Sequence, residues 1–270
     1  MVNVSIITIG MNHLRFIQNL YRTLLTEHRP KISFEVIYVD NCSQDGSVEW
    51  LSETYPEVKI IKNDNVLGFG ENNNIGVMAS TGRYIAIINP DIEFLDDAID
   101  KLYQYAEKMK GDFGILAPKL LNPDRSVQYS ARNFITIRTF LNRAISRGND
   151  ETNNSSVGNY LCKNMETGKV QPVNWVMGAA LFLPRDMYAK LGGFDLSYFL
   201  YMEDEDLCLR AWKKGRQVIY CGDIAVIHNH QKGSRKVGKK MLIHFQSLFT
   251  FFRKHGWNIQ NPVVNGTITA

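Results

Sequence analysis

Long apolar runs, leader features and clustered cysteines are all missing from this sequence. No apolar run approaches the ~18 residues that a transmembrane helix needs. The N-terminal stretch MVNVSIITIG lacks the basic flank and the small-residue cleavage site of a signal peptide. The four cysteines are scattered without CxxC spacing, which argues against a zinc site and against a disulfide framework. These absences predict a cytoplasmic protein with reduced thiols.

Two phosphate-binding signatures are absent as well. The chain has no G-x-x-x-x-G-K-[ST] stretch, which argues against a P-loop enzyme. Its first strand-to-helix turn has no G-x-G-x-x-G, which argues against a Rossmann dehydrogenase, and the glycines of GFGENNNIG have a different spacing. The net charge of +4 is mild, so no nucleic-acid partner is predicted.

What is present is an ordinary globular composition, 44% hydrophobic and 21% charged, in 270 residues. This length suits one large α/β domain or one domain with an appendage. In the first half, apolar strand patterns alternate with helical spacing, which predicts βαβ units and a mostly parallel sheet with helices on both faces. The predicted strands are 4–9, 34–39, 58–61 and 84–88, and the predicted helices are 14–26, 48–54, 71–80 and 95–109.

The second half is less regular. Polar residues dominate 145–170, which predicts a mobile loop. Late strands are expected at 216–220 and 224–227, and a terminal helix at 239–254. No internal repeat and no linker divides the chain into independent domains.

The stretch INPDIEF, residues 88–94, ends the fourth strand with Asn89-Pro90-Asp91. Such a sequence is typical of a turn. It also suits a metal site, because ligands of parallel sheets bind beyond the carboxyl ends of the strands. Asp40 lies at another such end, and an acidic cluster, Glu203-Asp204-Glu205-Asp206, follows later. Oxygen-rich sites with few histidines suit Mg²⁺ or Mn²⁺ better than zinc, and such an ion commonly holds a diphosphate.

Five sequence segments, which together span about residues 4 to 234, occur in an order that is informative about the family. They are VSIITIGMN, EVIYVDNCSQDGS, NVLGFGENNNIGVMASTGRYIAIINPDIEF, WVMGAALFLPRDMYAKLGGFDLSYFLYMEDEDLCLRAWKKG and VIHNHQKGS. In this order they resemble an inverting family 2 glycosyltransferase of the GT-A fold, in its rhamnosyltransferase-like branch. The resemblance implies a catalytic domain at 1–235, with a nucleotide-sugar half at 1–115, an acceptor half at 116–235 and a C-terminal helical extension at 236–270.

The resemblance also implies a nucleotide-sugar pocket at the strand ends. Asp40 matches the family's acid that accepts a hydrogen bond from the uracil or thymine imide. Asp91 matches the second acid of the family's DxD, with Asn89 in the place of the first. The implied donor-binding residues are Thr8, Asn12, Asp40, Gly68, Asn72, Asn74, Asn89 and Asp91. Loop and helix capping explain Asn72 and Asn74 equally well.

Asp91 and His228 are the implied metal ligands, which would hold Mg²⁺ or Mn²⁺ against the donor diphosphate. His230 is an alternative to His228. The stretch MEDED matches the family's E-D-x-D, which implies that Asp204 is the general base that takes the proton from the acceptor hydroxyl. Arg132, in YSARNF, is a further candidate for contact with the acceptor or the phosphates.

The acceptor side is implied to include Trp175, Gly178, Glu203 and Asp206. A core tryptophan and a tight turn are equally good explanations of Trp175 and Gly178. Glu203 and Asp206 also suit the first turn of the helix that follows, where acids are stabilising. A solvated face is the expected position of Glu205.

Basic and aromatic residues mix in the C-terminal stretch KVGKKMLIHFQSLFTFFRKHGW. An amphipathic helix of this kind can lie on an anionic membrane, and it can also pack on the catalytic domain with a solvated basic face. Packing is the preferred interpretation. Membrane contact would suit a lipid-linked acceptor, so a peripheral location at the inner face of the cell membrane stays open.

The predicted activity is metal-dependent, inverting transfer of a sugar from a UDP- or dTDP-sugar to a hydroxyl of a surface polysaccharide or lipid-linked glycan. Rhamnose is the first expectation, from branch resemblance alone, while galactose, glucose and N-acetylhexosamine stay open. The alternative is a catalytically inactive GT-A binding subunit of a glycan-assembly complex, against which the intact Asp91 and Asp204 argue. A nucleotidyltransferase would need a Gly- and Arg-rich loop after the first strand, and GMNHLRF is a poor match.

Overall fold

The computed structural model of the protein describes residues 1–145, 154–229, 239–264 and 267–269. Strands and helices alternate through the first half, as predicted. The strands are β1 (Val4–Gly10), β2 (Phe34–Asp40), β3 (Lys59–Lys62), β4 (Tyr84–Ile88), β5 (Ile92–Phe94), β6 (Ile115–Leu121), β7 (Ala131–Arg132), β8 (Val170–Pro172), β9 (Trp175–Val176), β10 (Ala180–Pro184), β11 (Val218–His228), β12 (Val263–Val264) and β13 (Thr267–Ile268). The helices are α1 (Leu14–Tyr21), the π-helical turn η1 (Arg22–Glu27), α2 (Ser47–Thr54), α3 (Phe69–Met78), α4 (Ala98–Lys108), α5 (Ile137–Ile145), α6 (Ser155–Tyr160), α7 (Arg185–Leu191), α8 (Glu203–Lys213) and α9 (Lys239–His255).

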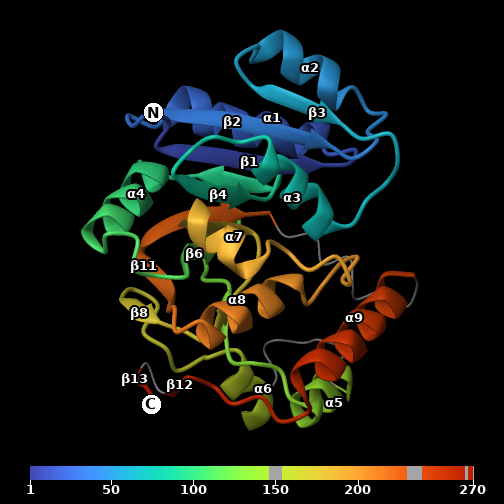
Figure 1. The fold of residues 1–270 in the computed structure, drawn as a ribbon, viewed down its shortest axis with the longest axis vertical. Helices are drawn as coiled ribbons and strands as arrows, with labels where there is room; N and C mark the ends of the chain where they lie inside the picture. Colours follow the sequence, from blue (N-terminus) through green and yellow to red (C-terminus); the bar gives the residue numbers. More distant parts are fainter. Residues whose placement is uncertain (146–153, 230–238, 265–266, 270) are drawn as a thin grey trace.

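Within the described residues, nine strands form one central sheet in the order β3-β2-β1-β4-β10-β6-β11-β5, with β8 also paired to β11 (Figure 1). The strands β3, β2, β1 and β4 are parallel. Beyond them the sheet is mixed, because β10 runs antiparallel to β4 and β6, and β5 and β8 run antiparallel to β11. The predicted α/β class is confirmed.

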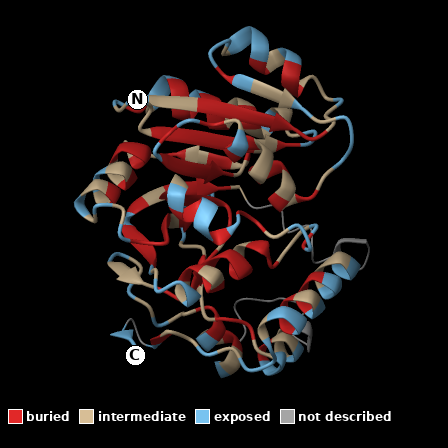
Figure 2. Ribbon diagram, in the orientation of Figure 1, coloured by how far each residue is buried: buried red, intermediate tan, exposed pale blue. Residues whose placement is uncertain are grey.

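Helices cover both faces of this sheet, and the alternation of side chains along β1 shows how. Ile6 belongs to an apolar cluster with residues of α1 and α4, whereas Ile7 belongs to a second cluster with residues of α3, α7 and α8. Both side chains are fully buried, and Figure 2 shows that buried residues follow the strands. Burial of one such side chain contributes ~1.5–3 kcal/mol. Two-sided burial is why these strands read as continuous apolar runs.

The first helix departs from its prediction. It is α-helical only as far as Tyr21, and the rest of the predicted 14–26 is the π-helical turn η1. The Thr23 hydroxyl donates to the Asn19 carbonyl (2.9 Å) and accepts from the Phe94 N–H (3.1 Å). A threonine that competes for a backbone carbonyl loosens a helix, and here it also ties the turn to β5.

Two predictions for the second half also change. The late strands expected at 216–220 and 224–227 form the single strand β11, whose register against β6 shifts between Cys221 and Ala225. The loop expected over 145–170 contains α6, whose N-terminus is capped by the Asn154 side chain. Residues 146–153 of that loop lie outside the described residues.

The inner side of α9 is anchored in the core. Leu248, Phe251 and Phe252 are buried in the same apolar cluster as the sheet residues that pack against α3 and α8. No described helix is long and apolar enough to cross a membrane. The domain boundaries at 115, 235 and 236 stay predictions, since these contacts do not test them.

Candidate active site

The carboxyl ends of β1 and β2 lie side by side, because Gly10 pairs with Asp40 in the parallel register. Asn12 follows with a φ of 56°, a left-handed conformation that asparagine tolerates better than most residues. Its side-chain oxygen accepts from the Gln44 N–H (2.8 Å), and its own N–H donates to Ser43 Oγ (3.0 Å). Asn12 therefore supports the turn that follows β2.

Asp40 is almost fully buried at the end of β2, with 3% of its surface exposed. Its Oδ2 accepts from the Ser43 N–H (3.0 Å). Within the described residues, its Oδ1 has no hydrogen-bond partner. A buried carboxylate oxygen without a donor is costly, so this atom marks a place where a donor from outside the chain would be stabilising.

Asn41, the next residue, is not among the residues predicted for the site. Its position directly after Asp40, at the end of a strand, is the sequence feature that could have indicated it. Its side chain donates to the Leu67 carbonyl (3.0 Å) and accepts from the Leu67 N–H (2.9 Å). Asn63 extends the network by donating to Asn72 (2.6 Å). The three asparagines fasten the loop that leads from β3 to α3.

Gly68, at the start of α3, lies where another backbone comes very close. A Cβ on this residue would stand 2.7 Å from the carbonyl oxygen of Phe199, so only glycine fits. Asn72 donates to the Gly68 carbonyl (2.8 Å), and Asn74 accepts from the Phe194 N–H (2.9 Å). These are structural contacts, and the donor-binding roles of Asn72 and Asn74 stay predictions.

Asp91 and His228 are brought together, although 137 positions of sequence numbering separate them. His228 Nε2 lies 3.5 Å from Asp91 Oδ1. Gln128 orients the ring: its Nε2 donates to the His228 carbonyl (2.7 Å), so its Oε1 accepts from His228 Nδ1 (2.8 Å). The proton is thus on Nδ1, and Nε2 presents its lone pair. Burial lowers the pKa of His228 to about 4, so the ring is neutral at pH 7.

A neutral imidazole nitrogen beside a carboxylate oxygen is a donor set that fits one divalent cation. Among the described residues the set has two members, because these residues contain no group of three or more His, Cys, Asp or Glu that could hold a metal. Mg²⁺ typically completes its shell with water and substrate phosphates, so two protein ligands suit it. His230, the alternative ligand, lies outside the described residues.

The segment between β9 and β10 links the Asp91 region to the acidic cluster. The Asn89 N–H donates to the Ala179 carbonyl (2.8 Å). The neighbouring Gly178 N–H donates to Asp204 Oδ2 (2.8 Å). A Cβ at Gly178 would stand 3.1 Å from the Asp204 Cβ, so this glycine lets the first turn of α8 approach the end of β4.

Glu203 and Asp204 are two acids with different surroundings. Burial, followed by the charge of Asp204, raises the pKa of Glu203 well above its usual value. Burial also raises the pKa of Asp204, against the effect of hydrogen bonds from the N–H groups of Gly178 and Glu205. Within the described residues, Glu203 Oε2 has no partner. The two backbone N–H groups favour the ionised form of Asp204, whereas Glu203 Oε2 has no such donor within the described residues.

The prediction that Glu205 lies on a solvated face is wrong. Only 1% of its surface is exposed. Its carboxyl group accepts from the Ile135 N–H (2.7 Å), and burial raises its pKa well above the usual value. This hydrogen bond connects α8 to the segment before α5. It also gives the buried Ile135 N–H an acceptor that it would otherwise lack.

Asp206 is also buried, with 1% of its surface exposed. Its carboxylate binds the Arg210 guanidinium (2.6 Å) and His255 Nε2 of α9 (2.6 Å), and it accepts a long hydrogen bond from Tyr198 (3.4 Å). These contacts join α8 to α9. Its predicted place on the acceptor side is not tested by them.

Trp175 and Arg132 form an adjoining layer. The Trp175 ring is buried, and its N–H donates to the Asn133 carbonyl (2.7 Å). The Arg132 guanidinium lies over the rings of Trp175 (5.4 Å) and Tyr160 (5.6 Å). Its positive charge also acts on Asp204, where it opposes the rise in pKa caused by burial.

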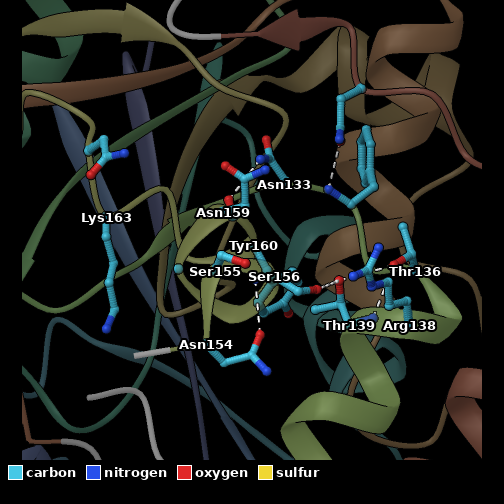
Figure 3. Close-up of a pocket in the computed structure, with 14 residues that line it drawn as sticks. Asn133, Thr136, Arg138, Thr139, Asn154, Ser155, Ser156, Asn159, Tyr160 and Lys163 are labelled. Carbon is cyan, nitrogen blue, oxygen red and sulfur yellow. Dashed lines mark hydrogen bonds between the residues drawn. The ribbon is translucent and has the colours of Figure 1, made fainter. Parts of the chain in front are cut away.

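A separate cavity of about 650 Å³ lies beside α5 and α6 (Figure 3). Hydroxyl and amide groups line most of it, including Thr136, Asn154 and Ser156, with Lys163 at one side. None of the predicted site residues lines this cavity. The cavity is therefore separate from the candidate active site around Asp91 and Asp204.

A family model described as "Glycosyl transferase family 2" matches residues 5–163. The N-acetylglucosaminyl-diphospho-decaprenol L-rhamnosyltransferase of Mycobacterium tuberculosis (strain CDC 1551 / Oshkosh) is 31% identical over 259 residues, which cover 90% of this chain and 81% of that protein. Rhamnosyltransferase WbbL of Escherichia coli (strain K12) is 25% identical over 259 residues, 93% of each chain.

Among solved structures, the mannosyltransferase PcManGT from Pyrobaculum calidifontis, in complex with GDP-Man and Mn²⁺, superposes with a TM-score of 0.63 at 17% identity. The match covers 93% of this chain and 64% of that one, so this chain spans slightly less than two thirds of the mannosyltransferase. At this identity the likeness concerns the fold.

Proposed function

Because this chain belongs to glycosyl transferase family 2, we propose that it transfers a sugar from a UDP- or dTDP-sugar to an acceptor hydroxyl with inversion at the anomeric carbon. It is a glycosyltransferase. One observation carries the proposal for the site: the Asp91–His228 pair and the Gly178–Asp204 contact both lie within two residues of the Asn89–Ala179 hydrogen bond.

Asp40 is the proposed reader of the nucleobase. Its buried Oδ1 needs a hydrogen-bond donor, and the imide N–H of uracil or thymine supplies one. A charged acceptor strengthens such a bond. The asparagine network around Asn41 would keep the neighbouring loop closed over the base.

Asp91 and His228 are the proposed protein ligands of Mg²⁺ or Mn²⁺. When bound, the ion offsets the negative charge that develops on the departing nucleoside diphosphate. The chain's own contribution is to hold a carboxylate and a neutral imidazole at one strand end, with Gln128 fixing the ring.

Asp204 is the proposed base. The acceptor oxygen forms a bond to the anomeric carbon, the bond from that carbon to the diphosphate oxygen breaks, and Asp204 takes the acceptor's proton. Both of its oxygens are held by backbone N–H groups, from Gly178 (2.8 Å) and Glu205 (2.9 Å). This holds the carboxylate in one orientation before the acceptor arrives.

We propose rhamnose as the sugar and a lipid-linked glycan as the acceptor, supported by the names of the mycobacterial and Escherichia coli relatives. The proposed division is a donor half at 1–115, an acceptor half at 116–235 and a C-terminal extension at 236–270. We also propose that the enzyme is cytoplasmic and meets its acceptor at the membrane surface.

The test is a panel of UDP- and dTDP-sugars with purified protein, Mn²⁺ or Mg²⁺, and EDTA. Calorimetry measures donor binding, and an enzymatic assay measures released nucleoside diphosphate. We expect one donor to bind only with the metal. Asp91→Asn should weaken this binding about 100-fold, since a bound ion supplies several kcal/mol.

The matched control is Asp96→Asn, an aspartate between β5 and α4 whose side chain is 80% exposed, and it should bind the donor normally. Equal binding in EDTA would remove the metal from the proposal. No donor binding by the folded protein would instead support the inactive binding subunit.

A further inference from the structure

Large apolar side chains are exposed along α5, along α9 and at Trp257, two residues after the end of α9. Between 41% and 60% of the surface of each is exposed, and they are Ile137, Leu141, Leu242, Phe245, Phe249 and Trp257. They form one surface, because the ring of Phe245 contacts that of Phe140 in α5 (5.3 Å) and the ring of Phe249 contacts that of Trp257 (6.5 Å). We call this surface the α5–α9 face (Figure 1).

The α5–α9 face is not the side of α9 that folding requires. Leu242, Phe245 and Phe249 follow i, i+3, i+7 spacing, so they share one side of the helix. The adjoining side of the helix is already buried in the core through Leu248 and Phe251. Packing on the domain and contact with a membrane, which the sequence left as alternatives, therefore belong to different sides of one helix.

Electrostatics favour an anionic surface as the occupant. Neither α5 nor α9 contains an aspartate or a glutamate. Among the described residues, their exposed basic side chains include Arg138 and Arg253. A second copy of this chain would bring two basic faces together, which is repulsive. Exposed aromatic side chains flanked by basic residues are typical of helices that lie in a membrane interface.

The inner contacts of α9 would transmit its position to the base. His255 Nε2 binds Asp206 Oδ1 (2.6 Å), in the first turn of the helix that carries Asp204. Lys254 also pairs with Asp195. Because α9 is fixed to α8 on its inner side, a surface that binds the α5–α9 face would also fix the orientation of α8.

We propose that the α5–α9 face docks on an anionic phospholipid surface, with Leu242, Phe245 and Phe249 in the headgroup region and Arg138 and Arg253 against the lipid phosphates. This inference rests on the proposed function for its purpose, since it brings the base to the membrane where a lipid-linked acceptor lies. The contact itself is independent of the reaction.

The experiment is flotation of the purified full chain with vesicles of phosphatidylcholine alone or mixed with phosphatidylglycerol. The wild type should float with the anionic vesicles and dissociate at high salt. Leu242→Ser combined with Phe249→Ser should weaken binding at least ~10-fold, because two apolar side chains no longer leave water. The control is Met78→Ser, an apolar residue of α3 that is 86% exposed, and it should float normally.

Each other outcome has a definite meaning. Equal flotation of wild type and double variant, or no flotation of the wild type, would overturn the proposal. A wild-type dimer that the double variant converts to a monomer would assign the face to a second copy instead. Release of nucleoside diphosphate without vesicles should be equal in both proteins. If neither protein releases it while flotation still differs, the proposed function fails and the docking surface stands.

Discussion

Asp40 is the last residue of β2, and Asp91 lies in the turn after β4, so both are at ends of strands in the parallel half of the sheet. Asp204, by contrast, lies in the first turn of α8, which contacts segments from elsewhere in the chain. The register of β1, β2 and β4 sets the strand ends that carry the proposed donor-side acids, and the packing of β11 then brings His228 to Asp91. The acids in the first turn of α8 are held by distant segments: Gly178 contacts Asp204, Ile135 contacts Glu205, and α9 contacts Asp206. The proposed donor side thus begins at the ends of neighbouring parallel strands, whereas the proposed acceptor side depends throughout on packing between segments distant in the sequence.

The base assignment is the sharpest test of the acceptor side. Asp204→Asn should lower transfer about 1,000-fold, as expected when a general base is lost. The asparagine oxygen can still accept from the Gly178 N–H, while the Glu205 N–H loses its acceptor; the fold should therefore be kept at a cost of about 1 kcal/mol, and donor binding should stay unchanged. Steady-state kinetics and calorimetry measure the two effects separately.

Glu203→Gln is the matched control for that prediction. Glu203 is the neighbouring acid that we expect to be protonated already, so its amide should support transfer within a few-fold of the wild type. If Glu203→Gln lost activity and Asp204→Asn kept it, the two roles would be exchanged.

Asp206 tests whether long-range packing holds the acceptor side together. Asp206→Ala should lower the free energy of unfolding by about 3 kcal/mol, because it leaves Arg210 and His255 without their buried partner. Denaturant unfolding measures this change. Asp186→Ala removes another i,i+4 ion pair, but one whose side chains are 70% and 65% exposed, and it should cost at most about 0.5 kcal/mol. Similar losses in both variants would contradict the distinction.

Asp40 tests the local construction of the donor side. Asp40→Asn places an amide N–H₂ near the imide N–H, so UDP binding should weaken about 10- to 150-fold, which corresponds to the loss of a hydrogen bond to a charged group. CDP, whose base lacks that N–H, should lose much less. Calorimetry with both nucleotides gives the ratio, and an equal loss for UDP and CDP would move the base site elsewhere.

The pH dependence of kcat/KM is the smallest expected effect. Asp204 must be deprotonated to act, and burial raises its pKa, so activity should fall as the pH drops through this raised value. Arg132→Ala removes a positive charge that favours the ionised form, and the acid limb should then move to higher pH. Arg138→Ala, in the exposed part of α5, is the control and should leave the limb in place.

Much of the donor side could be predicted from the sequence alone. Apolar runs that end in Asp40 or in Asn89-Pro90-Asp91 identify both the strands and their carboxyl ends, because side-chain burial on two faces leaves a continuous pattern. The sequence could not show that Thr23 would convert the end of the first helix into η1. That depends on a hydrogen bond to Phe94, which is distant in sequence.

The acceptor side was predicted less well for the same reason. The sequence does not show which of the four consecutive acids, 203–206, are buried, and Glu205 was expected in solvent. Their burial follows from which elements pack around the first turn of α8. Gln128 shows the same limit, since nothing in its neighbourhood in the sequence indicates that it orients His228.

The sequence by itself determined the α/β alternation, the strand ends and the residue types that suit a nucleotide sugar and a divalent ion, because these depend on periodicity and local chemistry. Only the tertiary structure decided which acid is held by Gly178, which ones are buried as structural ties, and which side of α9 faces outward. Those distinctions depend on desolvation and on contacts between distant segments, and no local pattern records them.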